Sequence, residues 1–480
     1  MAELPDDWEM VVGLEVHTEL ATATKLFCGC ANAFGGEPNT NVCPVCLGLP
    51  GSLPVLNEKA VELAIRIGLA LHCQIAPSVF ARKNYFYPDQ PKDYQISQYD
   101  KPINGIGHLD LPDGTRVLVE RAHMEEDTGK TTHLGGTGRI HGADESIVDY
   151  NRAGVPLVEI VSGPDIRSAE QARRYAAELR SILIATGASD GRMEEGSMRV
   201  DANVSVRRGP DAPFGTRCEI KNLNSLRSVQ RAIDHEALRQ VLLLEDGQTI
   251  VQETRHWDED AGRTQTLRYK EEAYDYRYFP EPDLVPLAPS DEQIDAIRAS
   301  LPAMPAERRR TLVALMGEQV TESQADQIAS VVDQGIDRYV MAAAAAGVAA
   351  PLALARVANE LAGALSDGGH LDEDTMVVLL QMEEAGEVSA TQSKAVLADL
   401  VADGGGDPRA VAKTKGFEQM AAGALDAVLD AVIAENPDAW QRYVEGDDKL
   451  TGFFTGKVMA ATKGQADGKA VNAGLRQRRG

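Results

Sequence analysis

The chain has 480 residues, of which 43% are hydrophobic and 25% charged, so it is long enough for two or three globular domains. No apolar run approaches the roughly 18 residues of a membrane helix, and the acidic start MAELPDDWEM lacks an apolar signal-peptide core. We therefore expect a cytoplasmic protein without membrane contact. A net charge of −25 argues against extended nucleic-acid binding, which needs clustered Lys and Arg.

The first predicted strand, GLEVHTEL at residues 13–20, alternates between two kinds of side chain. Strand side chains alternate between faces, so residues two apart stand in a row about 7 Å apart. One face then carries Glu15, His17 and Glu19, and the other carries Leu14, Val16 and Thr18. A row of three ionisable groups indicates a functional face.

Four cysteines follow as two close pairs, Cys28-x-Cys30 and Cys43-x-x-Cys46. This spacing is typical of a tetrahedral Cys₄ zinc site, and the cytosol disfavours disulfides. Free reduced thiols or a redox pair are the alternatives. Cys73 and Cys218 have no such neighbours and are expected to be buried as small hydrophobic residues.

The aromatic segment RKNYFYPD at residues 82–89 permits two interpretations. Its rings can pack in a core, or they can form the wall of a site in which Lys83 and Asn84 meet phosphate. GASDG at residues 187–191 matches the G-x-S-x-G pattern, but a helix is expected before it, whereas a nucleophile elbow requires a strand.

Three later segments repeat the alternation of the first strand, which is also what an ordinary sheet with one face in water produces. The polar-face residues are His123, Glu125 and Asp127 in TRVLVERAHMEED, Asp201, Asn203 and Ser205 in MRVDANVSV, and Glu219 and Lys221, followed by Asn222, in CEIKN. Closely packed carboxylates repel each other unless a cation lies among them. The concentration of Glu, Asp, Asn and His therefore favours a divalent-metal site on the sheet.

The chemistry indicated by such a face is nucleotide-dependent phosphoryl transfer. Carboxylate-rich sites suit Mg²⁺, which commonly bridges substrate phosphates, while His17 leaves Mn²⁺ or an indirect role open. TGKTT at residues 128–132 lacks the first glycine of a Walker A loop. A nucleotide would therefore bind on the sheet itself.

Helical patterns dominate after residue 290, beyond the Pro-rich segment EPDLVPLAPSDEQ. The segment VADGGGDPRAV near residues 401–411 predicts a linker. We expect domains at 1–290, 291–402 and 403–480. From Lys457 onward the chain carries three Lys and three Arg against Asp467 alone, which fits either a flexible basic tail or a local nucleic-acid contact.

Seven stretches of the first 290 residues closely resemble, in the same order, the B-subunit family of bacterial aspartyl/glutamyl-tRNA amidotransferases. They are VVGLEVHTEL, RKNYFYPDQPKDYQISQYD, HMEEDTGK, DYNRAGVPLVEIVSGPDIRS, MEEGSMRVDANVSVR, EIKNLNS and DYRYFPEPDLVPL. GKVMAATKGQADGKAVN resembles the family's C-terminal tail. The resemblance implies an α+β chain, with an N-terminal antiparallel-sheet catalytic domain similar to the glutamine synthetase fold, followed by all-α helical and tail domains.

The resemblance also implies a reaction and partners. ATP would phosphorylate the side-chain carboxylate of misacylated Glu-tRNA(Gln) or Asp-tRNA(Asn), and ammonia from an amidase, the A subunit, would displace the phosphate, with a small C subunit holding the heterotrimer together. Carried over by motif, Glu15, His17, Glu125 and Glu219 are the expected Mg²⁺ ligands, with Asp201 and Glu126 either as further ligands or as residues that support the ligands. Lys83, Asn84, Lys130, Lys221 and Asn222 are expected at ATP or the aminoacyl end, and Cys28, Cys30, Cys43 and Cys46 at structural Zn²⁺.

The helical domains and the basic end at Lys457–Arg479 would bind the tRNA. The alternative is a noncatalytic scaffold that presents tRNA to a partner enzyme.

Overall fold

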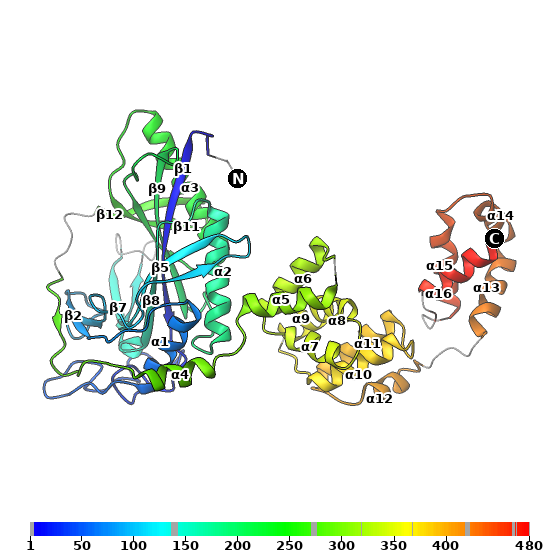
Figure 1. Cartoon of the computed structure of the whole chain (residues 1–480), viewed down its shortest axis with the longest axis horizontal. Helices are drawn as coiled ribbons and strands as arrows, with labels where there is room; N and C mark the ends of the chain where they lie inside the picture. Colours follow the sequence, from blue (N-terminus) through cyan, green and yellow to red (C-terminus); the bar gives the residue numbers. More distant parts are fainter. Residues whose placement is uncertain are drawn as a thin grey trace. The chain divides into compact units, whose positions relative to one another are not determined.

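An eleven-stranded sheet forms the centre of the N-terminal part of the chain in the computed structural model (Figure 1). In order across the sheet, its strands are β12 (Arg263–Tyr269), β11 (Glu253–Asp258), β10 (Cys218–Leu223), β9 (Met198–Arg208), β1 (Trp8–Glu19), β8 (Pro156–Ser162), β5 (Arg116–Glu126), β3 (Tyr94–Ser97), β2 (Ala81–Asn84) and β13 (Phe279–Pro280), with β4 (Gly107–Asp110) on β5. A separate hairpin joins β6 (Lys130–Leu134) to β7 (Glu145–Asp149), followed by the 3₁₀ turn η1 (Tyr150–Arg152).

The structure describes residues 4–135, 143–269, 276–317, 319–366, 368–417, 423–462, 466 and 468–479. It divides into two compact units, Met1–Pro305 and Ala306–Gly480, and the α+β class is confirmed. No helix in the described ranges is both long and apolar enough to cross a membrane. The predicted division after residue 290 stays a prediction.

The prediction of an antiparallel sheet is wrong at one pair of strands, so the sheet is mixed. β10 and β11 run parallel, and the helix α3 (Leu226–Glu245) connects them. Parallel neighbours need a long crossover, which this 20-residue helix supplies, whereas a tight turn can join only antiparallel strands. Ser225 begins α3 by accepting a hydrogen bond from the backbone N–H of Ser228.

One face of the sheet, here called the apolar face, is covered by α3 together with α1 (Glu58–Ala70) and α2 (Ala169–Ala185) (Figure 1). The alternation predicted for β1 is confirmed, because Leu14 and Val16 lie in this core with at most 1% of their surface exposed. Glu15 and His17 therefore point to the opposite face, here called the polar face. The sheet thus has a hydrophobic core on its apolar face and a row of ionisable groups on its polar face.

A β-bulge in β5 decides which residues of that strand reach the polar face. The register with β8 shifts between Val119 and Arg121. Val119 before the bulge and Met124 after it both lie in the core, although one number is odd and the other even. The bulge therefore turns Arg121 and the odd-numbered residues after it toward the polar face.

The second unit is helical. Its helices are α5 (Pro305–Met316), α6 (Glu322–Asp333), α7 (Asp337–Ala345), α8 (Ala350–Arg356), the π-helical turn η2 (Val357–Leu361), α9 (Ala362–Ser366), α10 (Glu373–Glu384), α11 (Ala390–Ala402), α12 (Pro408–Thr414), α13 (Ala424–Glu435), α14 (Pro437–Val444), α15 (Leu450–Ala461) and α16 (Gly468–Arg479). The helix α4 (Asp291–Ala299) precedes them in the first unit. Leu400 of α11 and Ala412 of α12 share one core, although the predicted linker lies between them. The division after residue 402 stays a prediction.

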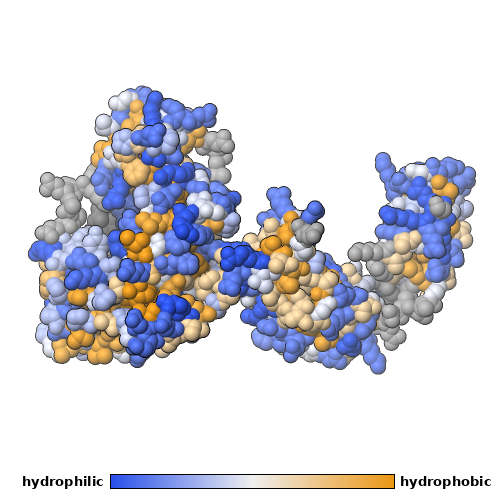
Figure 2. Space-filling view, in the orientation of Figure 1, coloured by the Kyte–Doolittle hydropathy of each residue, from blue (hydrophilic) through white to orange (hydrophobic). Residues whose placement is uncertain are grey.

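A separate core at the end of the chain includes Phe454, Val471 and Leu475. The described part of the basic segment is therefore packed helix, which contradicts the flexible-tail alternative for these residues. Figure 2 shows hydrophilic side chains spread over the visible surface of this part and of the rest of the chain. Arg478 contacts Asp426 and Asp430, so some of the basic charge is already paired within the fold.

Candidate active site

A histidine and two carboxylates meet on the polar face where β1, β5 and β8 run side by side. Glu159 of β8 lies opposite both His17 of β1 and His123 of β5 in the strand register. His17 Nε2 is 3.3 Å from Glu159 Oε2 and 3.7 Å from Glu125 Oε1. One ligand atom from each of these three residues lies within 4.8 Å of the others. We call His17, Glu125 and Glu159 the central cluster.

Glu159 was not among the residues expected from the sequence. It is the single charged residue of β8, PLVEIVS, whose other members are hydrophobic apart from the final serine. A lone Glu at an alternating position in an apolar strand was the available signal. A pattern that requires several polar residues in one segment misses such a position.

The central cluster has a strongly perturbed electrostatic environment. Burial raises the pKa of Glu125 to about 7, and the charge of Glu159 acts in the same direction. Burial alone would lower the pKa of His17, but the hydrogen bond and charge of Glu159 outweigh it and raise that pKa to about 9. His17 therefore holds a proton at neutral pH that a metal ion bound through Nε2 would replace.

The donor set fits a divalent cation. An octahedral ion with bonds of about 2.1 Å needs neighbouring ligand atoms about 3 Å apart, close to the separations within the cluster. His123 lies directly against it, with Nε2 3.8 Å from Glu159 Oε2. Its side chain is fully buried, and neither ring nitrogen has a hydrogen-bond partner within the described residues. Unpartnered buried nitrogens favour a ligand or ordered water at this place.

A second group of polar side chains lies beside the central cluster on β1, β9 and β10. Lys221 Nζ is 2.7 Å from Asp201 Oδ2 and 2.8 Å from Glu219 Oε1. Asn203 donates a hydrogen bond of 2.9 Å to Glu15 Oε1. Burial and the charges of Glu159 and Glu219 raise the pKa of Glu15, so the two groups interact electrostatically. The four expected Mg²⁺ ligands therefore fall into two adjacent groups.

Burial disfavours the Lys221 ammonium, but the charges of Asp201 and Glu219 outweigh it and raise its pKa, so Lys221 stays protonated.

The structure separates the residues expected to meet nucleotide. Lys83 of β2 lies near the central cluster, and its charge opposes the rise in the pKa of Glu125 that burial causes. Asn84 instead donates a hydrogen bond of 2.9 Å to the carbonyl oxygen of Arg277. Lys130 is exposed in β6, which pairs with β7 in the separate hairpin. Asn222 belongs to β10, and its side chain lies outside the described residues.

Tyrosine rings border the central cluster and Lys83. Their ring centroids follow one another at 6.2, 6.0 and 5.4 Å, and we call Tyr85, Tyr276, Tyr278 and Tyr99 the tyrosine row. Lys83 Nζ lies 4.9 Å from the centroid of Tyr276. Phe86 and Tyr87 are exposed, so core packing does not explain the whole aromatic segment, and the site-wall interpretation applies to Tyr85.

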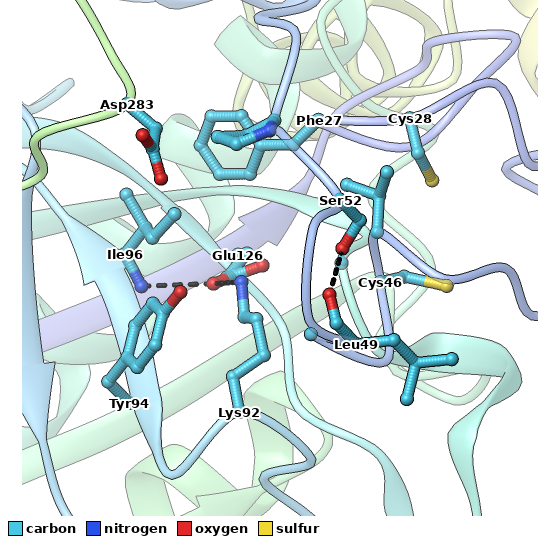
Figure 3. Close-up of a pocket in the computed structure, with 14 residues that line it drawn as sticks. Phe27, Cys28, Cys46, Leu49, Ser52, Lys92, Tyr94, Ile96, Glu126 and Asp283 are labelled. Atoms are coloured by element: carbon cyan, nitrogen blue, oxygen red, sulfur yellow. Dashed lines mark hydrogen bonds and ion pairs between the residues drawn. The ribbon is translucent and has the colours of Figure 1, made fainter.

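Glu126 lies apart from the central cluster, because successive strand residues point to opposite faces. Figure 3 shows its carboxylate between the ammonium of Lys92 and the backbone N–H of Ile96, which donates a hydrogen bond of 3.0 Å. This pair lines a pocket of about 60 Å³ beside Cys28 and Cys46. Glu126 thus connects the sheet to the cysteine loop. Its expected role as a further metal ligand, or as a residue that supports the ligands, stays a prediction.

The four cysteines form a second candidate metal centre. Their sulfur atoms all lie within 4.8 Å of one another, and Cys43 Sγ is 3.8 Å from Cys46 Sγ. A tetrahedral zinc site with Zn–S bonds of about 2.3 Å has sulfur atoms about 3.8 Å apart. The hydrogen bond from Cys28 lowers the pKa of Cys46 to about 5, while the same hydrogen bond raises the pKa of Cys28. A metal bound to all four sulfur atoms would therefore replace the proton that Cys28 and Cys46 share.

A fully buried lysine, Lys25, lies next to the four cysteines. Lys25 Nζ donates a hydrogen bond of 2.9 Å to the carbonyl oxygen of Asn41 and lies 3.8 Å from Cys46 Sγ. Four thiolates around Zn²⁺ carry a net charge of −2, so a buried ammonium offsets part of it.

We expect Lys25→Met to bind the metal at least about tenfold more weakly in competition with a chelator, because about 1.4 kcal/mol of lost charge compensation corresponds to a factor of ten in affinity. Metal release with a colorimetric chelator measures this. Lys59→Met is the control, since Lys59 is exposed and pairs with Glu62 on α1. Equal metal release from the unaltered protein, Lys25→Met and Lys59→Met would contradict the expected role of Lys25.

Comparisons with known proteins agree over nearly the whole chain. A family model described as the GatB/GatE catalytic domain matches residues 10–295, and one described as the GatB domain matches residues 338–478. The aspartyl/glutamyl-tRNA(Asn/Gln) amidotransferase B subunit of Frankia casuarinae is 52% identical, over 98% of this chain and 96% of its own length. Those of Nocardia farcinica and Carboxydothermus hydrogenoformans are 50% and 46% identical over 98% of this chain and 96% and 99% of their own.

Proposed function

The chain belongs to the family of aspartyl/glutamyl-tRNA(Asn/Gln) amidotransferase B subunits, and on that premise we propose that its polar sheet face activates the substrate carboxylate with ATP. The amidotransferase converts misacylated Glu-tRNA(Gln) or Asp-tRNA(Asn) to Gln-tRNA(Gln) or Asn-tRNA(Asn). The observation that supports the ATP-dependent step is the central cluster, in which His17, Glu125 and Glu159 meet within 4.8 Å.

Activation is needed because a carboxylate has no adequate leaving group. In the proposed first step, a side-chain carboxylate oxygen of the aminoacyl group attacks the γ-phosphorus of ATP, and the bond from that phosphorus to the β–γ bridging oxygen breaks, releasing ADP. In the second step, ammonia attacks the carbonyl carbon of the acyl phosphate. The carbon–oxygen bond to phosphate breaks, inorganic phosphate leaves, and the nitrogen loses a proton to give the amide.

The residues of this chain would position and neutralise the reacting groups. His17, Glu125 and Glu159 would hold Mg²⁺, with Glu15, Asp201 and Glu219 as neighbouring candidates. The bound cation would neutralise phosphate charge. Lys83, near Glu125 and the tyrosine row, adds a positive charge on the side of β2. In phosphoryl transfer such positioning and electrostatic stabilisation supply most of the catalysis.

The proposed assembly is a cytoplasmic heterotrimer with two partner chains. One is an amidase, the A subunit, which releases ammonia from glutamine, and the other is a small C subunit. The helical unit, with the basic residues of α15 and α16, would contact the tRNA body. Zn²⁺ bound by Cys28, Cys30, Cys43 and Cys46 would shape the loop and take no part in the reaction.

Phosphate release from ATP by the purified complex tests the proposal. Ammonia is supplied directly, and mischarged tRNA, correctly charged tRNA and no tRNA are compared. We expect release only with mischarged tRNA, and the tRNA that works identifies the substrate. A complex that binds the mischarged tRNA without releasing phosphate would support the scaffold alternative.

A further inference from the structure

Arg121 lies at the edge of the central cluster with its hydrogen-bonding capacity unused. Its Nε is buried and has no hydrogen-bond partner within the described residues. Its two terminal nitrogens approach Glu120 and Glu159 only at 3.8 and 4.0 Å, which is beyond hydrogen-bond distance. A buried N–H donor normally finds an acceptor, and the Arg121 side chain is only 22% exposed, so this arrangement favours an anionic ligand at this place.

Two features of the fold hold the guanidinium there. The bulge between Val119 and Arg121 turns Arg121 toward the polar face, two residues before His123 and four before Glu125. The guanidinium carbon lies 4.6 Å from the ring centroid of Tyr99, and that ring stacks on Tyr278 with the centroids 5.4 Å apart and the planes at 16°. Stacking on Tyr99 fixes the plane of the guanidinium group and leaves all of its N–H donors available for hydrogen bonds.

The position of Arg121 beside the carboxylates of the central cluster indicates which kind of anion would bind there. Arg121 shares the polar face with Glu159 and Glu125, which would repel an anion unless a cation lay between them. Phosphate oxygens bridging between a divalent cation and a guanidinium satisfy both partners. The planar guanidinium of an arginine can donate two parallel hydrogen bonds to two oxygens of one phosphate, which a lysine ammonium cannot do with the same geometry.

We propose that Arg121 binds the non-bridging oxygens of the phosphoryl group that passes from ATP to the substrate carboxylate. This inference rests on the proposed function. The guanidinium of Arg121 offers only N–H donors, so its role is to stabilise the charge that spreads over the transferred group. The stacked Tyr99 acts as a positioning residue for Arg121.

Arg121→Met and Arg121→Lys in the complete complex test the proposal. We expect Arg121→Met to lower kcat/KM for ATP in mischarged-tRNA-dependent phosphate release by about 100-fold, the usual cost of removing one such donor. Arg121→Lys should recover part of that loss, because it keeps the charge and loses the fork. Arg116→Met is the matched control, since Arg116 lies on the same strand, is exposed and pairs with Asp110.

Nucleotide binding measured by calorimetry in the presence of Mg²⁺ separates this inference from the proposed function. We expect Arg121→Met to weaken binding of a nonhydrolysable ATP analogue at least tenfold and to leave ADP binding within twofold. Equal loss for both nucleotides, or kinetics within twofold of the unaltered complex, would overturn the assignment to the transferred group. Phosphate release by the unaltered complex that does not depend on mischarged tRNA would contradict the proposed function itself, whatever the binding result.

A purely structural role for Arg121 is tested by thermal unfolding of the same variants. We expect the melting temperature of Arg121→Met to match that of the Arg116→Met control. A lowered melting temperature with normal kinetics at a permissive temperature would overturn the proposal.

Discussion

Replacing Glu125 with Gln should lower the kcat of mischarged-tRNA-dependent ATP cleavage by the complex roughly 100-fold to 1,000-fold. The amide keeps the shape of the carboxylate but removes the negative charge that faces His17 at 3.7 Å. The cluster would then hold a divalent cation less tightly and would place the phosphates less well. In the proposed assembly, glutaminase activity should remain measurable, because the proposal assigns it to a separate amidase chain.

Glu58→Gln is the control for this substitution. Glu58 is an exposed carboxylate in the first turn of α1, which covers the apolar face of the sheet. We expect Glu58→Gln to retain ATP cleavage within twofold, and Glu159→Gln to show the same large loss as Glu125→Gln. Unchanged ATP cleavage in Glu125→Gln would remove that carboxylate from the mechanism.

The alternation of β1 was predictable because a half-buried strand has a period of two. Leu14 and Val16 fill the core, and Glu15 and His17 face the other way, as the sequence alone indicates. The same reasoning applied to TRVLVERAHMEED after the bulge, where Met124 is buried in the core. Local sequence therefore determined the face of the side chains on β1 and on the part of β5 after the bulge, whereas the bulge itself was not predicted.

Partners across strands were not predictable, because pairing order depends on contacts between segments far apart in the sequence. β8 lies between β1 and β5, and only this order brings Glu159 to His17. The parallel pairing of β10 and β11 likewise follows from the packing of α3 and not from either strand. Alternation also grouped Glu219 with Lys221 without showing that Lys221 contacts Asp201 on β9.

The cysteine spacing predicted a cluster, and the structure confirms that the four sulfur atoms meet. The spacing did not reveal the buried Lys25, because a lysine near a cysteine in sequence is usually exposed. Nor did it reveal that Glu126 and Lys92 join the pocket beside this loop to the sheet (Figure 3). Both features depend on three-dimensional packing.

Substituting Cys46 with Ala should remove one zinc ion per chain and loosen the loop between residues 25 and 57. Cys46 is buried and lies 3.8 Å from Cys43 Sγ, so the variant leaves three thiolates around one open position. Structural zinc contributes about 10 kcal/mol or more to the folding of small domains, so losing it should cost this loop several kcal/mol of local stability. Metal analysis and hydrogen exchange over residues 25–57 measure the two effects.

Cys73→Ala is the matched control for Cys46→Ala. Cys73 is also a buried free thiol, but it belongs to the core of the sheet and not to the cysteine cluster. We expect it to keep one zinc ion per chain and normal exchange over the loop, even if its small cavity lowers overall stability. Protein purified without chelator and supplemented with zinc should contain one ion per chain. Clearly substoichiometric zinc under those conditions would contradict the assignment and favour four reduced thiols.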